Sequence, residues 1–249
     1  PVDLDRDGYK ELVTSYIEGG ATGTIGASVY ENVPPPSAEF FEWAVGDTIG
    51  PKGESAQFAA VDYEGKLWIT DYGTPGNVGL YVFNSDGTQA SFSPILSGLD
   101  QDGNTVTLTG AGGVAYYDSV IYAVSYGNNY ILKFKASDGT PLNGWQTALG
   151  NPGDIDIDAA GHVFVSKKVA AQFAVYDTEG NELEGSPFGT AGWYLNRGLS
   201  VTQDGSKVFL ADESSDVIAQ WEGGIFLNIA NYEKVTDFMT GLNDPSACE

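Results

Sequence analysis

Four carboxylates crowd into residues 3–11, which read Asp-Leu-Asp-Arg-Asp-Gly-Tyr-Lys-Glu. Acids alternate along this stretch, a glycine allows the backbone to turn, and a further acid follows the turn. Calcium takes about six to eight oxygen ligands, and a tight loop can offer it alternate side chains plus one backbone carbonyl. The pattern therefore predicts a Ca²⁺ site. Its ligands would be the side chains of Asp3, Asp5, Asp7 and Glu11 and the backbone carbonyl of Tyr9.

A plain acidic turn is the alternative for this loop. Calcium is the better interpretation because carboxylates packed so closely repel one another unless a cation offsets them. A weaker relative occupies residues 99–105, which read Leu-Asp-Gln-Asp-Gly-Asn-Thr. It has no acid after Asn104, so we expect a hydrated turn there rather than a metal site.

The residues needed for nucleophilic catalysis are scarce. His162 is the only histidine and follows a turn glycine, so it is expected to cap an exposed hairpin rather than to act as a base. Cys248 is the only cysteine, which excludes an intrachain disulfide and favours a small buried residue. Neither residue indicates a Ser-His-Asp or Cys-His arrangement. The sequence leaves enzymatic activity undecided and leans against it.

Two further groups have a structural and a functional interpretation. Asp154, Asp156 and Asp158 alternate and so share one face of a strand. They predict a polar strand face or channel lining, or else a ligand site at a channel mouth. Several aromatic residues lie in or near expected loops, where they either pack between repeats or stack on sugar rings: Tyr72, Tyr126, Trp145, Trp193 and Tyr194.

The charge balance excludes some partners. The chain has 34 acidic against 11 basic residues and a formal net charge of −23. Nucleic acids and anionic membrane surfaces are recognised by clustered Lys and Arg, so neither is expected as a partner. No apolar run is long enough to span a membrane. No leader is visible, and we expect an excised or mature piece of a secreted or cell-surface protein.

Internal repetition predicts the fold. Short apolar runs recur about every 45–55 residues, at 12–15, 67–70, 120–123, 163–166 and 208–211. A strand and a turn precede each run after the first, and a second alternating strand follows each one. Four-stranded antiparallel units at this spacing are typical of β-propeller blades. The composition agrees, because 33 glycines and many β-branched and aromatic residues favour an all-β fold.

We therefore predict one all-β domain over 1–249, a propeller of five four-stranded antiparallel blades. The blades would lie near 1–50, 51–105, 106–150, 151–195 and 196–245, with 246–249 as the closing strand of the first blade. Closing a propeller with strands from both ends removes open sheet edges. Two alternatives stay open: the repeats belong to a longer array, or the terminal strand completes a neighbouring molecule.

The repeats resemble the NHL-type propeller family and, more loosely, the gluconolactonase-like propellers. The residues that carry the resemblance are 62–71, 158–166 and 203–212, each an acidic turn with glycine followed by a short apolar strand. The first loop is similar to the calcium loops of FG-GAP, integrin-type propellers. Gluconolactonase-like enzymes hold a divalent metal on the channel axis with acids and an Asn. Matching residues would come from Glu54, Asp154, Arg197, Asn243 and Asp244, but no motif match carries catalytic roles to them.

Three functions are compatible with these patterns. The leading hypothesis is a calcium-stabilised, non-catalytic module that binds a protein or carbohydrate partner outside the cell or on its surface. The second is a metal-dependent hydrolase or lactonase in the propeller channel. The third is a structural subunit of an extracellular polymer, in which terminal strands are exchanged between neighbours.

Overall fold

The protein consists of short β-strands joined by turns. The computed structural model describes residues 12–18, 24–30, 40–43, 56–72, 78–190, 196–212 and 215–241; of these, 12–18, 24–30, 40–43, 56, 196–197 and 236 are described by their backbone alone. Within these ranges there are 20 strands and a 3₁₀ turn at Tyr126–Asn128. No helix among these residues has the length and apolar character needed to cross a membrane.

The first two sheets contain three antiparallel strands each. The first sheet is built from β1 (Leu12–Glu18), β2 (Thr24–Tyr30) and β3 (Phe40–Trp43). The second is built from β4 (Ala56–Val61), β5 (Leu67–Asp71) and β6 (Gly79–Phe83). In place of a fourth strand, Gln89 and Ile95 form isolated bridges to β6.

The third sheet is the largest. Its antiparallel core is β9 (Ala111–Tyr117), β10 (Val120–Ser125), β11 (Tyr130–Lys135) and β12 (Pro141–Gln146). The hairpin of β7 (Ser97–Leu99) and β8 (Thr105–Thr107) joins its outer edge through a parallel bridge between Asn143 and Leu99. The turn of this hairpin contains the acidic stretch that resembles the calcium loop.

The fourth and fifth sheets have four antiparallel strands each, as predicted. The fourth contains β13 (Pro152–Ile157), β14 (Val163–Lys167), β15 (Ala171–Tyr176) and β16 (Phe188–Thr190). The fifth contains β17 (Asn196–Val201), β18 (Lys207–Asp212), β19 (Val217–Phe226) and β20 (Ile229–Thr240).

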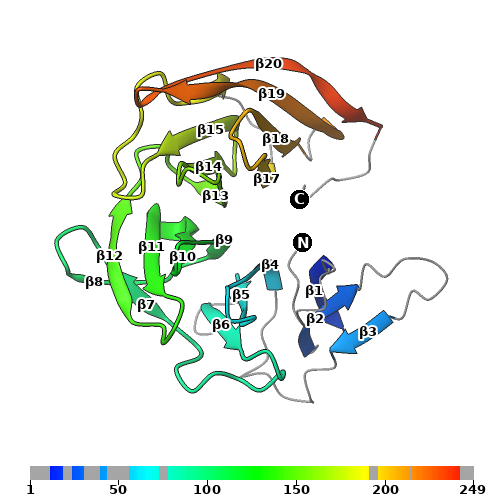
Figure 1. The fold of residues 1–249 in the computed structure, drawn as a ribbon, viewed down its shortest axis with the longest axis vertical. Coiled ribbons are helices and arrows are strands. Elements are labelled where there is room, and N and C mark those ends of the chain that lie inside the picture. The colour runs from blue at the N-terminus through cyan, green and yellow to red at the C-terminus, as the bar shows by residue number, and fades with distance from the viewer. Residues whose placement is uncertain are drawn as a thin grey trace.

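The sheets follow one another around a common centre (Figure 1). β4 contacts β9, β9 contacts β13, and β13 contacts β17, so these strands form the inner ring of the described structure. This is the architecture of a β-propeller, and it confirms the predicted all-β class. The four-strand pattern is exact only in the fourth and fifth sheets, because the second lacks a regular outer strand and the third gains a hairpin. The predicted closing strand, 246–249, lies outside the described residues.

Apolar side chains fill the spaces between neighbouring sheets. Trp68 of β5 is fully buried against residues of the third sheet, including Val114 and Leu132. Phe164 of β14 occupies the same kind of position against Leu199 of the fifth sheet. Burying one such side chain contributes about 2–3 kcal/mol. Strands that are covered on both faces explain the consecutive apolar residues in the sequence.

The inner strands β9 and β13 approach so closely that two adjacent glycines of β9, Gly112 and Gly113, have no room for a side chain. A Cβ atom added to Gly113 on β9 would lie 2.0 Å from Oδ1 of Asp154 and 2.6 Å from the backbone N of Ile155. Both atoms belong to β13, and the backbone N–H of Ile155 donates a hydrogen bond to Oδ1 of Asp154 at 2.8 Å. The absence of a side chain at Gly113 therefore sets the distance between the third and fourth sheets.

We expect Gly113→Ala to destabilise the fold by about 2 kcal/mol, because the added methyl group forces β9 away from β13. Gly224→Ala is the matched control, since a Cβ atom there has no neighbour within 4 Å. Urea unfolding followed by circular dichroism measures both changes. Equal unfolding midpoints for the two variants would contradict the role assigned to Gly113.

Candidate functional site in a cleft between the third and fourth sheets

Many of the residues singled out from the sequence lie outside the described part of the chain. These are Asp3, Asp5, Asp7, Tyr9, Glu11, Glu54, Trp193, Tyr194, Asn243, Asp244 and Cys248. Arg197 is described only as backbone within β17. Among the described residues, no three His, Cys, Asp or Glu side chains gather as they would around a metal ion.

The alternating acids on β13 join two sheets. Oδ2 of Asp154 accepts a hydrogen bond from the backbone N of Leu199 at 2.8 Å, and Oδ2 of Asp156 accepts one from Val201 at 2.7 Å. Both donors lie on β17 of the fifth sheet. Each carboxylate also accepts a bond from the next backbone N–H of its own strand. These carboxylates therefore link the inner strands β13 and β17 through hydrogen bonds from side chain to backbone.

Two of the predicted loop aromatics meet at one end of the inner strands. The rings of Tyr72 and Tyr126 lie 6.1 Å apart, and Nζ of Lys168 lies 4.2 and 4.3 Å from their centroids. The three residues follow β5, β10 and β14, so cation–π contacts join three successive sheets. Trp145, by contrast, is buried between sheets.

The acidic turn at residues 99–105 is closed by its own groups. Oδ1 of Asp100 accepts hydrogen bonds from the backbone N of Asp102 and Asn104, and the Asn104 amide donates to the same carboxylate. These bonds hold the pKa of Asp100 below its usual value, mainly through the Asn104 side chain. The turn thus satisfies the Asp100 carboxylate with its own backbone and side-chain donors.

A cleft of about 520 Å³ lies between the third and fourth sheets. Its walls come from β10, β11 and the turns that follow β9, β13 and β15. The tip of the β19–β20 hairpin also reaches the cleft through Asn228. Next to this tip, Ala230 donates a backbone hydrogen bond at 2.8 Å to the carbonyl of Glu184, which lies between β15 and β16. The lining side chains that concern its chemistry are Tyr117, Asp118, Tyr122, Lys133, His162, Glu179 and Asn228.

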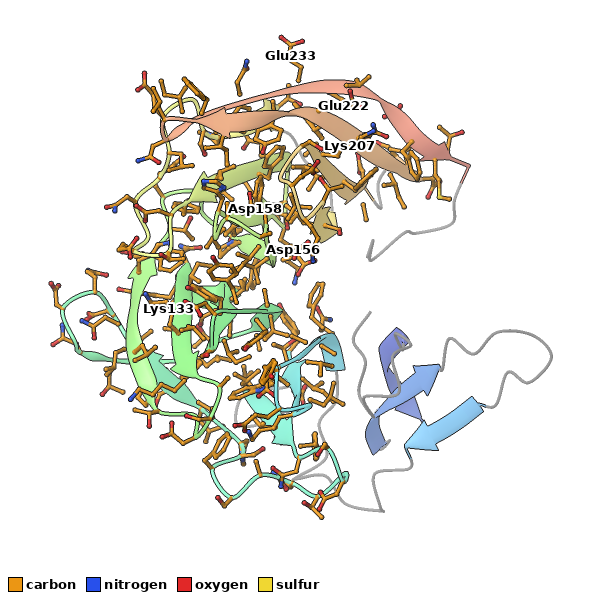
Figure 2. All side chains as sticks on the ribbon, in the orientation of Figure 1. Lys133, Asp156, Asp158, Lys207, Glu222 and Glu233 are labelled. Carbon is orange, nitrogen blue, oxygen red and sulfur yellow. The ribbon has the colours of Figure 1, made fainter. Side chains whose placement is uncertain are left out.

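Lys133 is the most unusual of these side chains. It lies on β11 of the third sheet, whereas Asp158 lies on the fourth (Figure 2). Its Nζ donates to the backbone carbonyl of Thr178 at 3.0 Å and lies 5.8 Å from the Trp145 ring. It makes no ion pair with any described carboxylate. Burial lowers its pKa, and the negative charges of Glu179 and Asp177 oppose that shift.

His162 is held in place by the turn that carries it. Its Nδ1 lies 2.7 Å from Oδ2 of Asp158, whose side chain is only 3% exposed. Oδ1 of the same carboxylate accepts the backbone N–H groups of Ala160 and His162. The contact with Asp158 directs Nδ1 into the turn, so Nε2 is the ring nitrogen that Asp158 does not engage. The histidine does lie in a hairpin turn, as predicted, but its side chain also forms part of the cleft wall.

Two tyrosines form the aromatic part of the wall. The Tyr117 ring packs against Gly161, where an added Cβ atom would lie 3.0 Å from the phenol oxygen. Gly161 has a φ of +89°, so both its conformation and this contact require glycine. Burial raises the pKa of Tyr122 to about 12, with a smaller effect from the charge of Glu179. Tyr122 is therefore a neutral hydrogen-bonding group at any physiological pH.

Three acidic residues also line the cleft, and their carboxylates differ in hydrogen bonding and in exposure. The Asp177 carboxylate is used by its own turn, where it accepts bonds from Glu179 and Asn181. Asp118 and Glu179 are exposed at the rim. The cleft thus combines an ammonium, an imidazole, phenols and carboxylates within one small volume. Such a set can donate and accept hydrogen bonds around a bound polar molecule.

Sequence reasoning missed Lys133 although a signal was present. The strand Tyr130–Lys135 carries a lysine between Leu132 and Phe134, which are both fully buried. A charged residue in the middle of such an apolar strand indicates either that this face of the strand is exposed to solvent or that polar groups surround the charge. Only the packing of the fourth sheet beside β11 shows that the environment is a cleft.

The comparison with known proteins rests on the fold. No protein-family model and no curated protein matches the sequence. A candidate 6-phosphogluconolactonase from Bacteroides uniformis has a TM-score of 0.65 at 14% identity, over 93% of this chain and 69% of its own. A protein from Lactobacillus plantarum has a TM-score of 0.63 at 16% identity, over 94% and 68%. Virginiamycin B lyase from Staphylococcus aureus has a TM-score of 0.56 at 10% identity, over 96% and 78%.

These likenesses support a propeller fold of the kind that the sequence repeats predicted. At such low identity they show the fold alone. None of them bears on the predicted calcium loop.

The buried phenol of Tyr122 should make stability depend on alkaline pH. Its pKa of about 12 exceeds the usual value of 10.0, so its contribution is present below pH 10 and is lost between pH 10 and 12. We expect Tyr122→Phe to reduce the loss of stability at pH 11 by roughly 1 kcal/mol. Urea unfolding at pH 9 and 11 measures this, with exposed Tyr63→Phe as the control. An unchanged pH dependence in Tyr122→Phe would contradict the burial of this phenol.

Proposed function

We propose that this protein is a non-catalytic binding module, secreted or displayed on a cell surface, whose ligand site is the cleft between the third and fourth sheets. The observation that carries the proposal is Lys133. A half-buried ammonium that contacts one carbonyl and no carboxylate has hydrogen-bonding capacity left for a ligand. It faces a cleft whose volume falls within the range of small-molecule sites.

The ligand that best fits these groups is an uncharged molecule rich in hydroxyl groups, such as a mono- or disaccharide. Anions are disfavoured by Asp118, Asp177 and Glu179 and by the net charge of −23. A simple cation would face the positive charge of Lys133. A hydroxyl group both donates and accepts, so it can pair with the ammonium and with the carboxylates. The Tyr117 ring adds an aromatic surface of the kind that stacks on the C–H face of a sugar ring.

The proposal is tested with a saccharide panel of glucose, galactose and N-acetylglucosamine, titrated into ¹⁵N-labelled protein. We expect saturable chemical-shift changes in strands that line the cleft. Lys133→Met should weaken binding about tenfold or more, because a hydrogen bond to a charged group contributes about 1.5–3 kcal/mol. Lys135→Met is the control, since Lys135 lies on the same strand but is exposed and outside the cleft.

Two results would reject the proposal. One is the absence of saturable shifts with every member of the panel. The other is equal weakening by Lys133→Met and Lys135→Met, which would assign binding to another surface. Preferential binding of gluconate or glucosamine in the same assay would also reject the uncharged ligand in favour of a charged one.

A metal-dependent hydrolase or lactonase in the propeller channel is the second candidate. It is favoured by the likeness in fold to a candidate 6-phosphogluconolactonase and to virginiamycin B lyase. Among the described acids of the inner strands, however, Asp154 and Asp156 already bind backbone groups of β17. This candidate requires a metal ion on the axis in addition to one in the 3–11 loop. Metal counting at saturation and an assay of lactone hydrolysis separate it from the binding module.

Calcium in the 3–11 loop remains part of the proposal, supported by the chemistry of its donor set. If Asp3, Asp5, Asp7 and Glu11 hold Ca²⁺ with the Tyr9 carbonyl, chelation should lower the melting temperature. Asp5→Ala should have a lower melting temperature than the unaltered chain and should lose its response to EDTA. Asp86→Ala, at an exposed turn, is the control and should keep that response. The melting temperatures are measured by thermal unfolding followed by circular dichroism. If EDTA does not change the melting temperature of the unaltered chain, the calcium assignment is refuted.

A further inference from the structure

We infer that Lys133 is a carbonyl-reactive amine, which forms a Schiff base with small aldehydes or ketones that enter the cleft. The inference rests on the proposed function in one respect, because it requires the cleft to admit ligands. It goes further in assigning covalent chemistry to one atom, Nζ of Lys133.

The surroundings of Lys133 differ from those of the other described lysines. Lys207 and Lys234 pair with carboxylates at 3.0 and 2.6 Å, and Lys66 pairs with Glu64. Lys168 lies against two tyrosine rings. Lys133 is half-buried and lines the cleft of about 520 Å³, with the Thr178 carbonyl as its hydrogen-bond acceptor. Its Nζ also lies over the Trp145 ring, 5.8 Å from the centroid.

Burial lowers the pKa of Lys133 and so raises the fraction of neutral amine, which is the form that attacks a carbonyl. Burial disfavours the charged form, and the carboxylates that would restore it lie beyond ion-pair distance. A lysine held in this way is more nucleophilic at neutral pH than one in open solvent. Glu179 and His162 line the same cleft and can exchange protons with a bound intermediate.

The reaction needs no cofactor, oxidant or reductant. The Nζ lone pair forms a bond to the carbonyl carbon while the C=O π electrons move to oxygen, which takes up a proton as Nζ loses one. A second proton transfer to the carbinolamine hydroxyl group lets it leave as water while the nitrogen lone pair completes the C=N bond. Loss of the remaining N–H proton then gives the neutral imine. One amine and one aldehyde give one imine and one water, with no change in oxidation state.

The test uses glyceraldehyde, an uncharged hydroxylated aldehyde, with cyanoborohydride to reduce the imine to a stable secondary amine. Labelling of the intact protein is followed by peptide mass spectrometry at each lysine over a series of pH values. We expect Lys133 to be labelled severalfold faster than Lys135 at neutral pH. We also expect its labelling to reach half of its maximum at a lower pH. Lys133→Arg keeps the positive charge and should abolish labelling at this position without altering Lys135.

The outcomes separate the inference from the proposed function. Labelling of Lys133 no faster than that of Lys135, or with the same pH midpoint, overturns the Schiff base. If the saccharide panel still binds in that case, the binding module stands without it. Rapid labelling of Lys133 in a protein that binds no saccharide supports the reactive amine and rejects the carbohydrate ligand.

Discussion

Burial of apolar surface between successive sheets is the interaction on which the rest of this structure depends. A single sheet of three or four short strands cannot bury both of its faces, so each one is stable only when a neighbour covers it. Trp68 and Phe164 do this at two of the described interfaces, with no exposure to solvent. The requirement explains why the repeat carries consecutive apolar residues in its second strand, and why the sheets follow one another around a centre (Figure 1).

Close packing at the centre then restricts which side chains the inner strands can accommodate. Gly113 allows β9 to approach β13, and the carboxylates of Asp154 and Asp156 accept hydrogen bonds across the gap to β17. Further from the centre the neighbouring sheets leave room between their turns, and the cleft beside Lys133 lies there. The acids that the sequence offered for a channel site thus have a structural role, whereas the polar groups free to meet a ligand line the cleft.

The fold was more predictable than the site. Repeated acidic turns such as 62–65 and 158–161 close in the same way, with the first carboxylate accepting backbone N–H groups two and four residues later. Such local bonds are encoded in a few adjacent residues. The extra hairpin of β7 and β8 was not predicted, because it is attached by residues distant in sequence, as in the parallel bridge to β12 from Leu99 to Asn143, 44 residues apart. Lys133 was not predicted as a site residue for a similar reason, because the acceptor of its hydrogen bond, the Thr178 carbonyl, belongs to another sheet.

The sequence alone determined the all-β class, the repeating strand–turn unit and the acidic character of the molecule, because period-two patterns and turn residues act over a few positions. From spacing alone it also predicts a calcium donor set in the 3–11 loop. Only the tertiary structure decided which polar groups meet. It placed His162 and Lys133, from different sheets, around one cleft. It also brought the carboxylates of Asp154 and Asp156 into hydrogen bonds with backbone N–H groups of β17. Contacts between sheets depend on packing over the whole ring, which no local stretch of sequence specifies.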